Sequence, residues 1–304
     1  MKPSISVIML TYNRENLLSR AVESVMSQTF ADFEFIIVNN GSTDRSGAIA
    51  DEYAKKDPRV RVVHRSKGNI GSGRNAGLAA AVGKYIAFID DDDWCEPDFL
   101  EFLHDLATKT GAEVAICGAH GRAFDEKLVM SAEEALVKLL WRKQYNVQFP
   151  TKLIKSSLFR SHRFSEQAKY DDIELMPKIL AAANKVAYHG QPKYTFYRHE
   201  GNNSAWTGDH SLLNGVILAE YLSVYRTRTE WLSVVFPTKA ALWRYFELSF
   251  MLSMAEKIAR HGLGDCYALL VDLKAELVAN RENFLSCEWV QDFEKAWVEE
   301  YVNG

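Results

Sequence analysis

The stretch Tyr85-Ile86-Ala87-Phe88-Ile89-Asp90-Asp91-Asp92-Asp93-Trp94 places four consecutive carboxylates directly after an apolar, strand-like run. Carboxylates this close repel one another, and some of them protonate unless a positive charge lies among them. Mg²⁺ and Mn²⁺ prefer oxygen ligands, and Mg²⁺ is typically held by one or two carboxylates together with substrate phosphates. The stretch therefore predicts a divalent cation and a phosphate-bearing ligand. The alternative is a solvated acidic turn that caps the next helix, with Pro97 in its first turn.

The part of the chain around this stretch alternates apolar runs with amphipathic segments, which is typical of a βαβ sheet. Open α/β sheets bind ligands at the carboxyl ends of their strands, and this favours the functional interpretation of the acidic run. We predict strands at Ile5–Leu10, Phe33–Val38, Val60–His64, Tyr85–Ile89 and Val114–Cys117. We predict helices carrying Leu17 to Val25 with Asn13 as cap, then over Ser46–Lys56, Asp98–Thr110, and from the capping box Ser131–Glu134 through Trp141.

The pattern changes near residue 208. Beyond it, the sequence predicts helices only, over Leu212–Val224, Lys239–Arg260, Asp265–Ala279 and Ser286–Val302. We therefore expect an α/β domain over residues 1–208 and a helical region over residues 209–304.

Composition excludes several classes of protein. The 304 residues are 47% hydrophobic and 25% charged, as in an ordinary globular protein, and the formal net charge of −4 argues against a nucleic-acid surface. The four cysteines form no C-x-x-C pair, so we expect a reduced, cytoplasmic setting. The first residues lack the apolar core of a signal peptide, and no run approaches 18 apolar residues, so we expect no membrane span.

Three further polar segments join the acidic run. Thr11, Tyr12 and Asn13 follow the first strand, where a polar side chain and an aromatic ring can hold a base or sugar; the alternative role of Asn13 is a helix cap. Asn39-Asn40-Gly41-Ser42-Thr43-Asp44 follows the second strand and equally fits a simple turn. Tyr170-Asp171-Asp172-Ile173-Glu174 opens a helix, where one acid is either a general base or a dipole cap.

A fourth segment, Gly68 to Gly77, is rich in glycine and contains Arg74, a residue suited to phosphate or carboxylate recognition. It includes a G-x-G-x-x-A pattern with an acid about twenty residues later, which raises the alternative of an NAD-binding oxidoreductase. That alternative fits poorly. Arg65 to Asn69 separate the pattern from the preceding strand, whereas the dinucleotide fingerprint follows its strand directly.

Together these segments resemble the family-2 glycosyltransferases, which are inverting enzymes with the GT-A fold, a Rossmann-like mixed α/β sheet. The resemblance is dense over about the first hundred residues, thins after Thr110 and returns at Tyr170-Asp171-Asp172. The motifs that carry it are Ile5 to Arg14, Ser27 to Phe30, Asn40 to Asp44, Asn69-Ile70-Gly71, Arg74 to Gly77, Gly83 to Phe88 and the acidic run.

The resemblance implies a metal-dependent transferase, a hexosyl- or N-acetylhexosaminyl-transferase, with a nucleotide-diphosphate sugar as donor and Mn²⁺ or Mg²⁺ as cofactor. Asp90, Asp91 and Asp92 stand at the D-x-D signature of the family, with Asp92 as metal ligand and the other two nearer the ribose and sugar. Asn69 and Arg74 match positions that contact the donor. Asp172 stands where the family places its catalytic base.

One departure concerns the nucleotide. The family usually has two aspartates where this chain has Asn39 and Asn40, and the second accepts a hydrogen bond from uracil N3–H. Asn40 can accept through its carbonyl but can also donate through its amide. UDP remains the expected nucleotide.

The remaining expectations concern the acceptor side. Arg198 and His199 are candidates for contacts to the diphosphate, and an ordinary histidine is the alternative. The helical region is expected to form the acceptor site or an oligomer interface. Its apolar residues either pack a core or dock a lipid-linked acceptor at the membrane, and they are Trp243, Phe246, Phe250, Met251 and Met254. A glycan or lipid-linked acceptor in bacterial surface polysaccharide synthesis is what the family suggests, and an inactive sugar-nucleotide-binding module is the non-enzymatic alternative.

Overall fold

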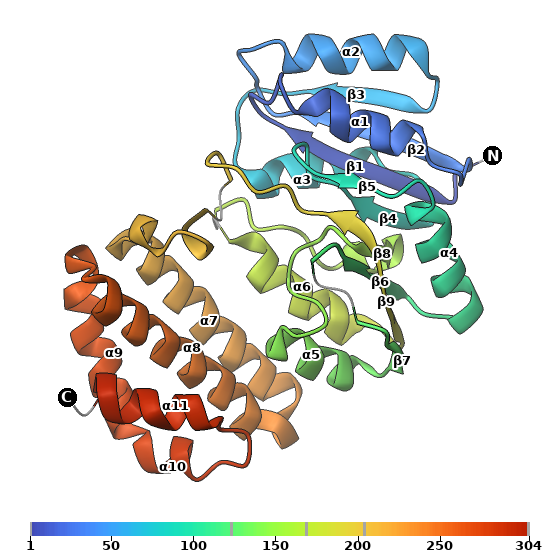
Figure 1. The fold of residues 1–304 in the computed structure, drawn as a ribbon. Helices are drawn as coiled ribbons and strands as arrows, with labels where there is room; N and C mark the ends of the chain where they lie inside the picture. The colour runs from blue at the N-terminus through green and yellow to red at the C-terminus, as the bar shows by residue number, and fades with distance from the viewer. Residues whose placement is uncertain (1, 122–123, 168–169, 203–204, 303–304) are drawn as a thin grey trace. The chain divides into compact units, whose positions relative to one another are not determined.

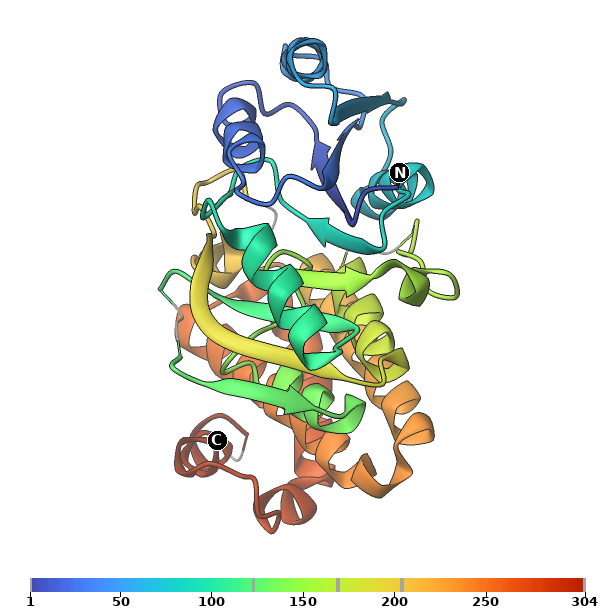
Figure 2. The same cartoon turned by 90° about the vertical axis from the view of Figure 1, so that its right-hand side faces the viewer.

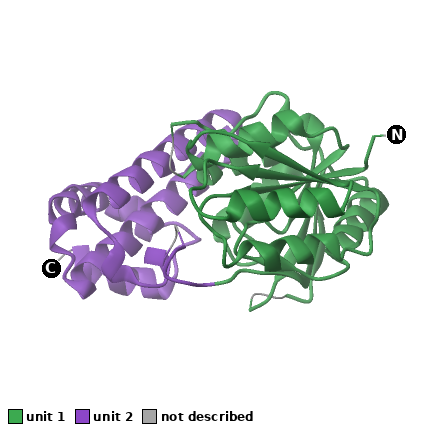
Figure 3. Ribbon diagram, turned by 90° about the horizontal axis from the view of Figure 1, so that it is seen from above, with its two compact units in different colours: residues 1–197 green, residues 198–304 purple. Residues whose placement is uncertain are grey.

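The computed structural model describes residues 2–121, 124–167, 170–202 and 205–302. The chain divides into two compact units, residues 1–197 and 198–304 (Figure 3). The expected boundary near residue 208 thus falls inside the second unit.

The first unit is built on one mixed sheet with the strand order β3-β2-β1-β4-β8-β6-β9-β5, and β7 pairs with β9 (Figures 1 and 2). Strands β1 to β4 are mutually parallel where they pair, β8 runs antiparallel to both its neighbours, and β6 and β9 are parallel. The strands are β1 (Ile5–Thr11), β2 (Phe33–Asn39), β3 (Val60–His64), β4 (Tyr85–Phe88), β5 (Trp94–Cys95), β6 (Val114–Ala119), β7 (Lys127–Met130), β8 (Lys152–Lys155) and β9 (Val186–Thr195).

All five predicted strands are present. The helices of this unit are α1 (Leu18–Met26), α2 (Ser46–Lys56), α3 (Ile70–Ala80), α4 (Phe99–Thr110), α5 (Ala132–Trp141) and α6 (Asp171–Ala182), and a 3-10 turn, η1, spans Ser156–Phe159. The capping box of Ser131 and Glu134 opens α5 as predicted. Asn13, however, does not cap α1, which begins at Leu18 with Leu17 at its N-cap; that part of the prediction is wrong.

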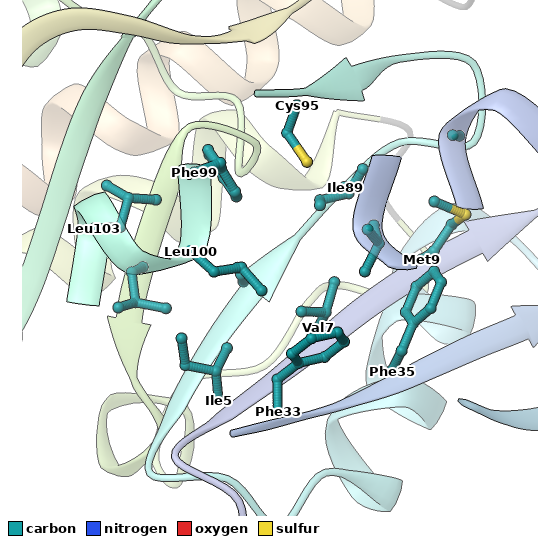
Figure 4. Packing of buried hydrophobic residues seen from close by; sticks show 14 of the residues in the cluster. Ile5, Val7, Met9, Phe33, Phe35, Ile89, Cys95, Phe99, Leu100 and Leu103 are labelled. Atoms are coloured by element: carbon teal, nitrogen blue, oxygen red, sulfur yellow. The ribbon is translucent and has the colours of Figure 1, made fainter. Parts of the chain in front are cut away.

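The two faces of the sheet are covered by different helices. Alternate residues of β1, such as Val7 and Met9, point into a core with α1 and α4, shown in Figure 4 with Phe99, Leu100 and Leu103 of α4. On the other face, α3 lies against β1. A Cβ added at Gly73 or Gly77 would collide with Leu10 or Ile8, so these glycines serve close helix–strand packing.

The second unit is helical. Its elements are η2 (Ala205–Thr207), η3 (His210–Leu212), α7 (Gly215–Val235), η4 (Pro237–Lys239), α8 (Ala240–His261), η5 (Gly264–Cys266), α9 (Tyr267–Ala279), α10 (Arg281–Leu285), α11 (Asp292–Trp297) and the π-helical turn η6 (Val298–Val302). Helix α7 extends eleven residues beyond the predicted Val224, to Val235. The single helix predicted over Ser286–Val302 is wrong, because a capping box between Gln291 and Glu294 starts a new helix there.

The apolar residues of α8 belong to the core of this unit. Trp243, Phe246, Met251 and Met254 are buried, and the half-buried Phe250 ring stacks on Tyr225 with ring centroids 3.8 Å apart. The core-packing interpretation is therefore confirmed, and these side chains do not present a membrane-docking face. Among the described helices, none is both long and apolar enough to cross a bilayer.

Candidate active site

The predicted site residues of the first unit gather at the edge where β1, β2 and β4 end. Thr11 is the last residue of β1, Asn40 follows β2, and Asp90 lies just beyond β4. The backbone N–H of Asn40 donates to the Thr11 carbonyl at 2.9 Å, and that of Ile89 donates to the Ile8 carbonyl at 3.1 Å. The loops after these three strands are therefore held side by side at the ligand-binding edge of an α/β sheet.

Two of the four carboxylates in the acidic run lie beside arginines. Asp90 Oδ1 is 3.7 Å from Nη2 of Arg74, and Asp91 Oδ1 is 3.9 Å from Nε of Arg14. Burial, with repulsion from Asp92, nevertheless raises the pKa of Asp90 to about 6 and that of Asp91 to about 7. The charges of Arg74 and Arg14 therefore only partly offset the effect of burial on Asp90 and Asp91.

Asp93 has a different role, because it fixes the acidic loop, residues 90–93, to β9. Its Oδ2 accepts from the Tyr194 hydroxyl at 2.9 Å, and its Oδ1 accepts from the Tyr197 backbone N–H at 2.7 Å. The Tyr194 oxygen in turn accepts from the Asp90 backbone N–H at 3.1 Å. Burial and the neighbouring Asp90 raise the pKa of Asp93 to about 8. The Asp93 side chain therefore has a structural role, in which it holds the acidic loop against the end of β9.

Asp92 is anchored through its backbone. The Arg20 guanidinium donates to the Asp92 carbonyl and lies over the Trp94 and Tyr197 rings, at 4.2 and 4.3 Å from their centroids. Sequence reasoning missed Arg20, because its partners are more than 70 residues away in the chain and no local pattern marks it. Its effect is to hold the loop so that the Asp92 side chain is presented from a fixed backbone.

The residues fit an oxygen-preferring cation. Within the described ranges, no three His, Cys, Asp or Glu side chains converge as a complete cage. Mg²⁺ does not require one, since a carboxylate or two and the substrate phosphates suffice. Burial, and to a smaller extent repulsion from Asp92, raise the pKa values of Asp90 and Asp91, and a bound cation would favour their ionised forms.

Arg74 connects the acidic loop to α6. Its Nη1 donates to Asp171 Oδ1 at 3.2 Å, while Nη2 faces Asp90, and its side chain is only 14% exposed. Arg74 thus lies at the predicted donor site and is held there by two acids from distant parts of the chain.

Asp172 lies in the first turn of α6, next to this ion pair. Its Oδ1 accepts from the backbone N–H of Ile173 at 2.9 Å, and the side chain is half-buried. Burial raises the pKa of Asp172, and the Arg74 charge partly opposes that rise. Asp172 also raises the pKa of Asp90, so the two carboxylates are close enough to interact. A carboxylate with a raised pKa beside a polar site suits a general base.

The two asparagines after β2 have separate roles. Asn39 accepts from the Ser42 N–H at 3.1 Å, and its amide lies 3.1 Å from His64 Nδ1. The Asn40 amide donates to the Gly68 carbonyl at 2.8 Å, whereas its buried Oδ1 has no hydrogen-bond partner among the described residues. The hydrogen bond to Gly68 thereby fixes the orientation of the Asn40 side chain, and its Oδ1 remains available to accept another hydrogen bond.

The other donor-site candidates are placed around this edge. The Tyr12 ring lies 4.6 Å from the Lys67 ammonium. Asn13 has a φ of 53°, and its side chain accepts from the Thr43 N–H at 2.8 Å. Asn69 caps α3 by accepting from the Ser72 N–H at 2.7 Å.

Arg198 and His199 belong to the second unit. The His199 backbone N–H donates to Asn202 Oδ1 at 2.7 Å, and the Gly201 N–H donates to His199 Nδ1 at 3.1 Å. Their contact with a diphosphate stays a prediction.

Comparison with known proteins defines the class of protein. The family model described as glycosyl transferase family 2 matches residues 6–166, and the chain belongs to that family. The chain is 33% identical over 211 residues to the putative glycosyltransferase EpsH of Bacillus subtilis (strain 168), covering 65% of this chain and 61% of EpsH. It spans 37% of two other curated relatives that it matches.

Solved structures support the fold. TarS 1-349 from S. aureus, in complex with UDP-GlcNAc, aligns with a TM-score of 0.57 and 19% identity over 93% of this chain and 89% of that chain. The mannosyltransferase PcManGT from Pyrobaculum calidifontis, in complex with GDP-Man and Mn²⁺, aligns with a TM-score of 0.58 and 15% identity over 100% and 86% of the two chains. The expected GT-A fold is confirmed.

Proposed function

We propose that this protein transfers a sugar from a UDP-sugar to a hydroxyl of a glycan or lipid-linked acceptor, with inversion and with a divalent metal. The proposal is carried by one juxtaposition: the Asn40 acceptor and the acidic loop lie at the same sheet edge, spaced along the loops after β2 and β4. The loop after β2 offers a hydrogen-bond acceptor to a base, and the loop after β4 offers carboxylates for a metal and sugar.

The nucleotide is proposed from the chemistry of Asn40. Its amide is committed to Gly68, so only its carbonyl is available to a ligand. Uracil presents N3–H to such an acceptor, whereas cytosine and adenine present an acceptor nitrogen at the corresponding ring position. Guanine N1–H is the competing donor. The TarS complex with UDP-GlcNAc supports uracil, and the PcManGT complex with GDP-Man makes guanine the comparison to test.

The metal is proposed to be held by Asp92 together with the diphosphate of the donor, with Asp90 and Asp91 toward the ribose and sugar. Mn²⁺ or Mg²⁺, when bound, stabilises the negative charge that develops on the leaving diphosphate. Asn69, the N-cap of α3, and Arg74, within that helix, are proposed to contact the donor. The Tyr12 ring is proposed to lie beside the base, with Thr11 and Asn13 in the same wall.

Asp172 is proposed as the base. The acceptor oxygen forms a bond to the anomeric carbon, the bond from that carbon to the diphosphate oxygen breaks, and the acceptor proton passes to the Asp172 carboxylate. A base on one face and a leaving group on the other give a single displacement with inversion. The first turn of α6 favours the carboxylate, because the helix N-terminus carries partial positive charge.

The test is a thermal-shift screen of nucleotide sugars with Mn²⁺, followed by transfer assays on Asp172→Asn. UDP-sugars should raise Tm more than GDP-sugars, CDP-sugars or NAD. Transfer by Asp172→Asn should fall by about 10²- to 10⁴-fold with UDP affinity near wild type. Normal turnover of this variant would overturn the role of Asp172. Wild type that binds UDP-sugar without releasing UDP to any acceptor would instead be an inactive binding module.

The wider setting is proposed from the family. The acceptor reaction belongs to bacterial surface polysaccharide synthesis, in the cytoplasm or at the inner face of the cell membrane. The helical unit is proposed to contribute the acceptor site or an oligomer contact. Arg198 and His199, which come shortly after the end of β9 in the chain, are proposed to contact the diphosphate.

A further inference from the structure

One face of α3 holds the part of the chain that comes just before Asp172. Gly71, Arg74 and Asn75 share this face, because residues three and four positions apart in a helix are neighbours on its surface. The opposite face of α3 packs on β1. The first face contacts residues 164–166, which precede α6 in the chain, and Asp171, the first residue of α6. Helix α3 therefore lies between the strand that ends at the donor site and the segment that carries the proposed base.

Asn75 binds the backbone of Phe164 through both ends of its side-chain amide. Its Nδ2 donates to the Phe164 carbonyl at 2.9 Å, and its Oδ1 accepts from the Phe164 N–H at 3.1 Å. The same Nδ2 also donates to Glu166 Oε1 at 3.0 Å. These three bonds use both donor hydrogens and the carbonyl of an asparagine amide. An ionised aspartate could not make the two donated bonds, so the contact is specific to the amide.

Gly71 brings α3 even closer to the same segment. A Cβ added at Gly71 would lie 2.1 Å from the Ser165 carbonyl oxygen and 3.2 Å from Asp171 Oδ2. Because both distances start from one point on α3, Ser165 and Asp171 approach the helix at the same place. This close approach requires a residue without a side chain. Residues 164–166 and the start of α6 are therefore held against α3 together.

The Phe164 ring ties the same segment to the donor side of the site. Phe164 is buried, and its ring centroid lies 5.4 Å from that of Phe88, the last residue of β4. Asp90 follows two positions after Phe88. The guanidinium carbon of Arg74 lies 5.3 Å from the centroid of the Phe164 ring. The backbone that Asn75 holds thus belongs to a residue packed between the end of β4 and Arg74.

We propose that Asn75 is a positioning residue for sugar transfer, which holds Phe164 against α3 and thereby sets the position of Asp172 relative to the donor. The inference rests on the proposed role of Asp172 as base. The ion pair of Arg74 with Asp171 holds the start of α6 itself, and Asn75 holds the segment before it. All three bonds of Asn75 go to that segment and not to the acidic loop, so losing them should displace the base and spare the metal and nucleotide contacts.

The first test is Asn75→Ala, assayed for sugar transfer and for UDP binding with Mn²⁺. Turnover, kcat, should fall by about 10²-fold, because small displacements of a reacting group have effects of this size. UDP affinity should stay near wild type. The matched control is Glu166→Ala, which removes one bond of Asn75 and leaves both bonds to Phe164. Its kcat should stay near wild type. A loss of UDP affinity as large as the loss of kcat in Asn75→Ala would overturn the inference, since it would assign Asn75 to the donor.

A double-mutant cycle separates positioning of the base from a general structural effect. In an Asp172→Asn background, Asn75→Ala should lower kcat little further, because the group that it positions has already been removed. A second loss of about 10²-fold in that background would show that Asn75 acts elsewhere and would overturn the inference.

Gly71→Ala takes the place of Asn75→Ala in the same measurements if the latter does not fold. Alanine favours the helix, while its Cβ would press on Ser165 and displace the same segment. Wild-type kcat in the folded variant would overturn the inference. Normal turnover by Asp172→Asn would mean that the proposed function itself fails. An inactive Asp172→Asn beside wild-type kcat in folded Asn75→Ala would mean that only the inference about Asn75 fails.

Discussion

Asp171 Oδ1 lies 3.2 Å from Nη1 of Arg74, and this contact joins two helices whose pairing residues are 97 positions apart in the chain. The Asp171 side chain is 4% exposed, so its charge depends on Arg74 for compensation. Because Asp171 and Asp172 share the first turn of α6, the ion pair also fixes the position of the backbone that carries Asp172, the proposed base. The ion pair between Arg74 and Asp171 therefore helps to hold the whole site in place.

Arg74→Gln should destabilise the protein by about 3–5 kcal/mol, because it leaves a buried carboxylate without its partner. Urea unfolding followed by circular dichroism measures the change. Arg61→Gln is the matched control, since Arg61 is half-exposed and lies 3.7 Å from Glu34. That variant should lose less than about 1 kcal/mol. Equal losses in the two variants would show that the Arg74 contact is not compensating a buried charge.

Asn40→Asp restores the residue type usual in the family, yet we expect this substitution to lower both the stability of the protein and its affinity for UDP. The carboxylate would face the Gly68 carbonyl, which now accepts from the Asn40 amide at 2.8 Å. Losing that donor in a buried position should cost about 1–3 kcal/mol of stability. UDP affinity, measured by calorimetry, should fall as well, because the loop from Gly68 to Asn69 loses its tether.

The control for this substitution is Asn39→Asp. The Asn39 amide lies beside His64 Nδ1, and His64 Nε2 lies 2.9 Å from Asp51. A histidine can present an N–H at Nδ1 by changing tautomer or by protonating, so it can donate to a carboxylate at position 39. This variant should therefore lose less stability than Asn40→Asp. If Asn40→Asp kept the stability of wild type while Asn39→Asp lost stability, the separate roles given to the two residues would be contradicted.

Much of the fold follows from local patterns. Five strands and the helices that start with clear caps or apolar stripes, such as α2 and α5, are where periodicity places them. Helix α3 was not predicted, because glycine has low helix propensity and the helix depends on packing against Leu10 and Ile8. Strand β9 was missed because Gly190 and Pro192 interrupt it, and both are usually breakers inside a strand.

The site could be predicted only in part. The acidic run, Asn40 and Asp172 were selected because their residue types carry chemistry at the ends of predicted elements. The division of roles within the acidic run could not be read from four identical side chains. It is set by partners that are distant in the chain: Arg74 for Asp90, Arg14 for Asp91, and Tyr194 for Asp93.

Asp92→Ala should weaken the metal response. Mn²⁺ titrations in the presence of UDP should show apparent metal affinity reduced by more than about tenfold, since even residues behind the ligands typically account for that much. Asp93→Asn serves as the control, because an amide can still contact Tyr194 and accept from the Tyr197 N–H. It should retain a metal response close to wild type. An unchanged response in Asp92→Ala would make the acidic loop structural.

The pH dependence of stability provides a test that needs no substrate. In metal-free protein, native Asp93 has a pKa of about 8, far above the value of about 4 for an unfolded aspartate. The native state therefore binds a proton that the unfolded state has lost between these values, so stability must fall as pH rises through this window. One such proton gives a slope of at most about 1.4 kcal/mol per pH unit. Free energies of unfolding measured in chelator from pH 5 to 8 should decline.

Asp93→Asn isolates this contribution, because the amide fills the same space and cannot titrate. Its stability curve should be flatter than that of wild type over the same window, and the two curves should diverge as pH rises. Mn²⁺ with UDP should stabilise wild type more at pH 8 than at pH 5, because the cation favours the ionised forms of Asp90 and Asp91, which burial disfavours. Parallel curves for wild type and Asp93→Asn would mean that the Tyr194 and Tyr197 contacts hold Asp93 ionised throughout. In that case its carboxylate would be part of the charge that the metal neutralises.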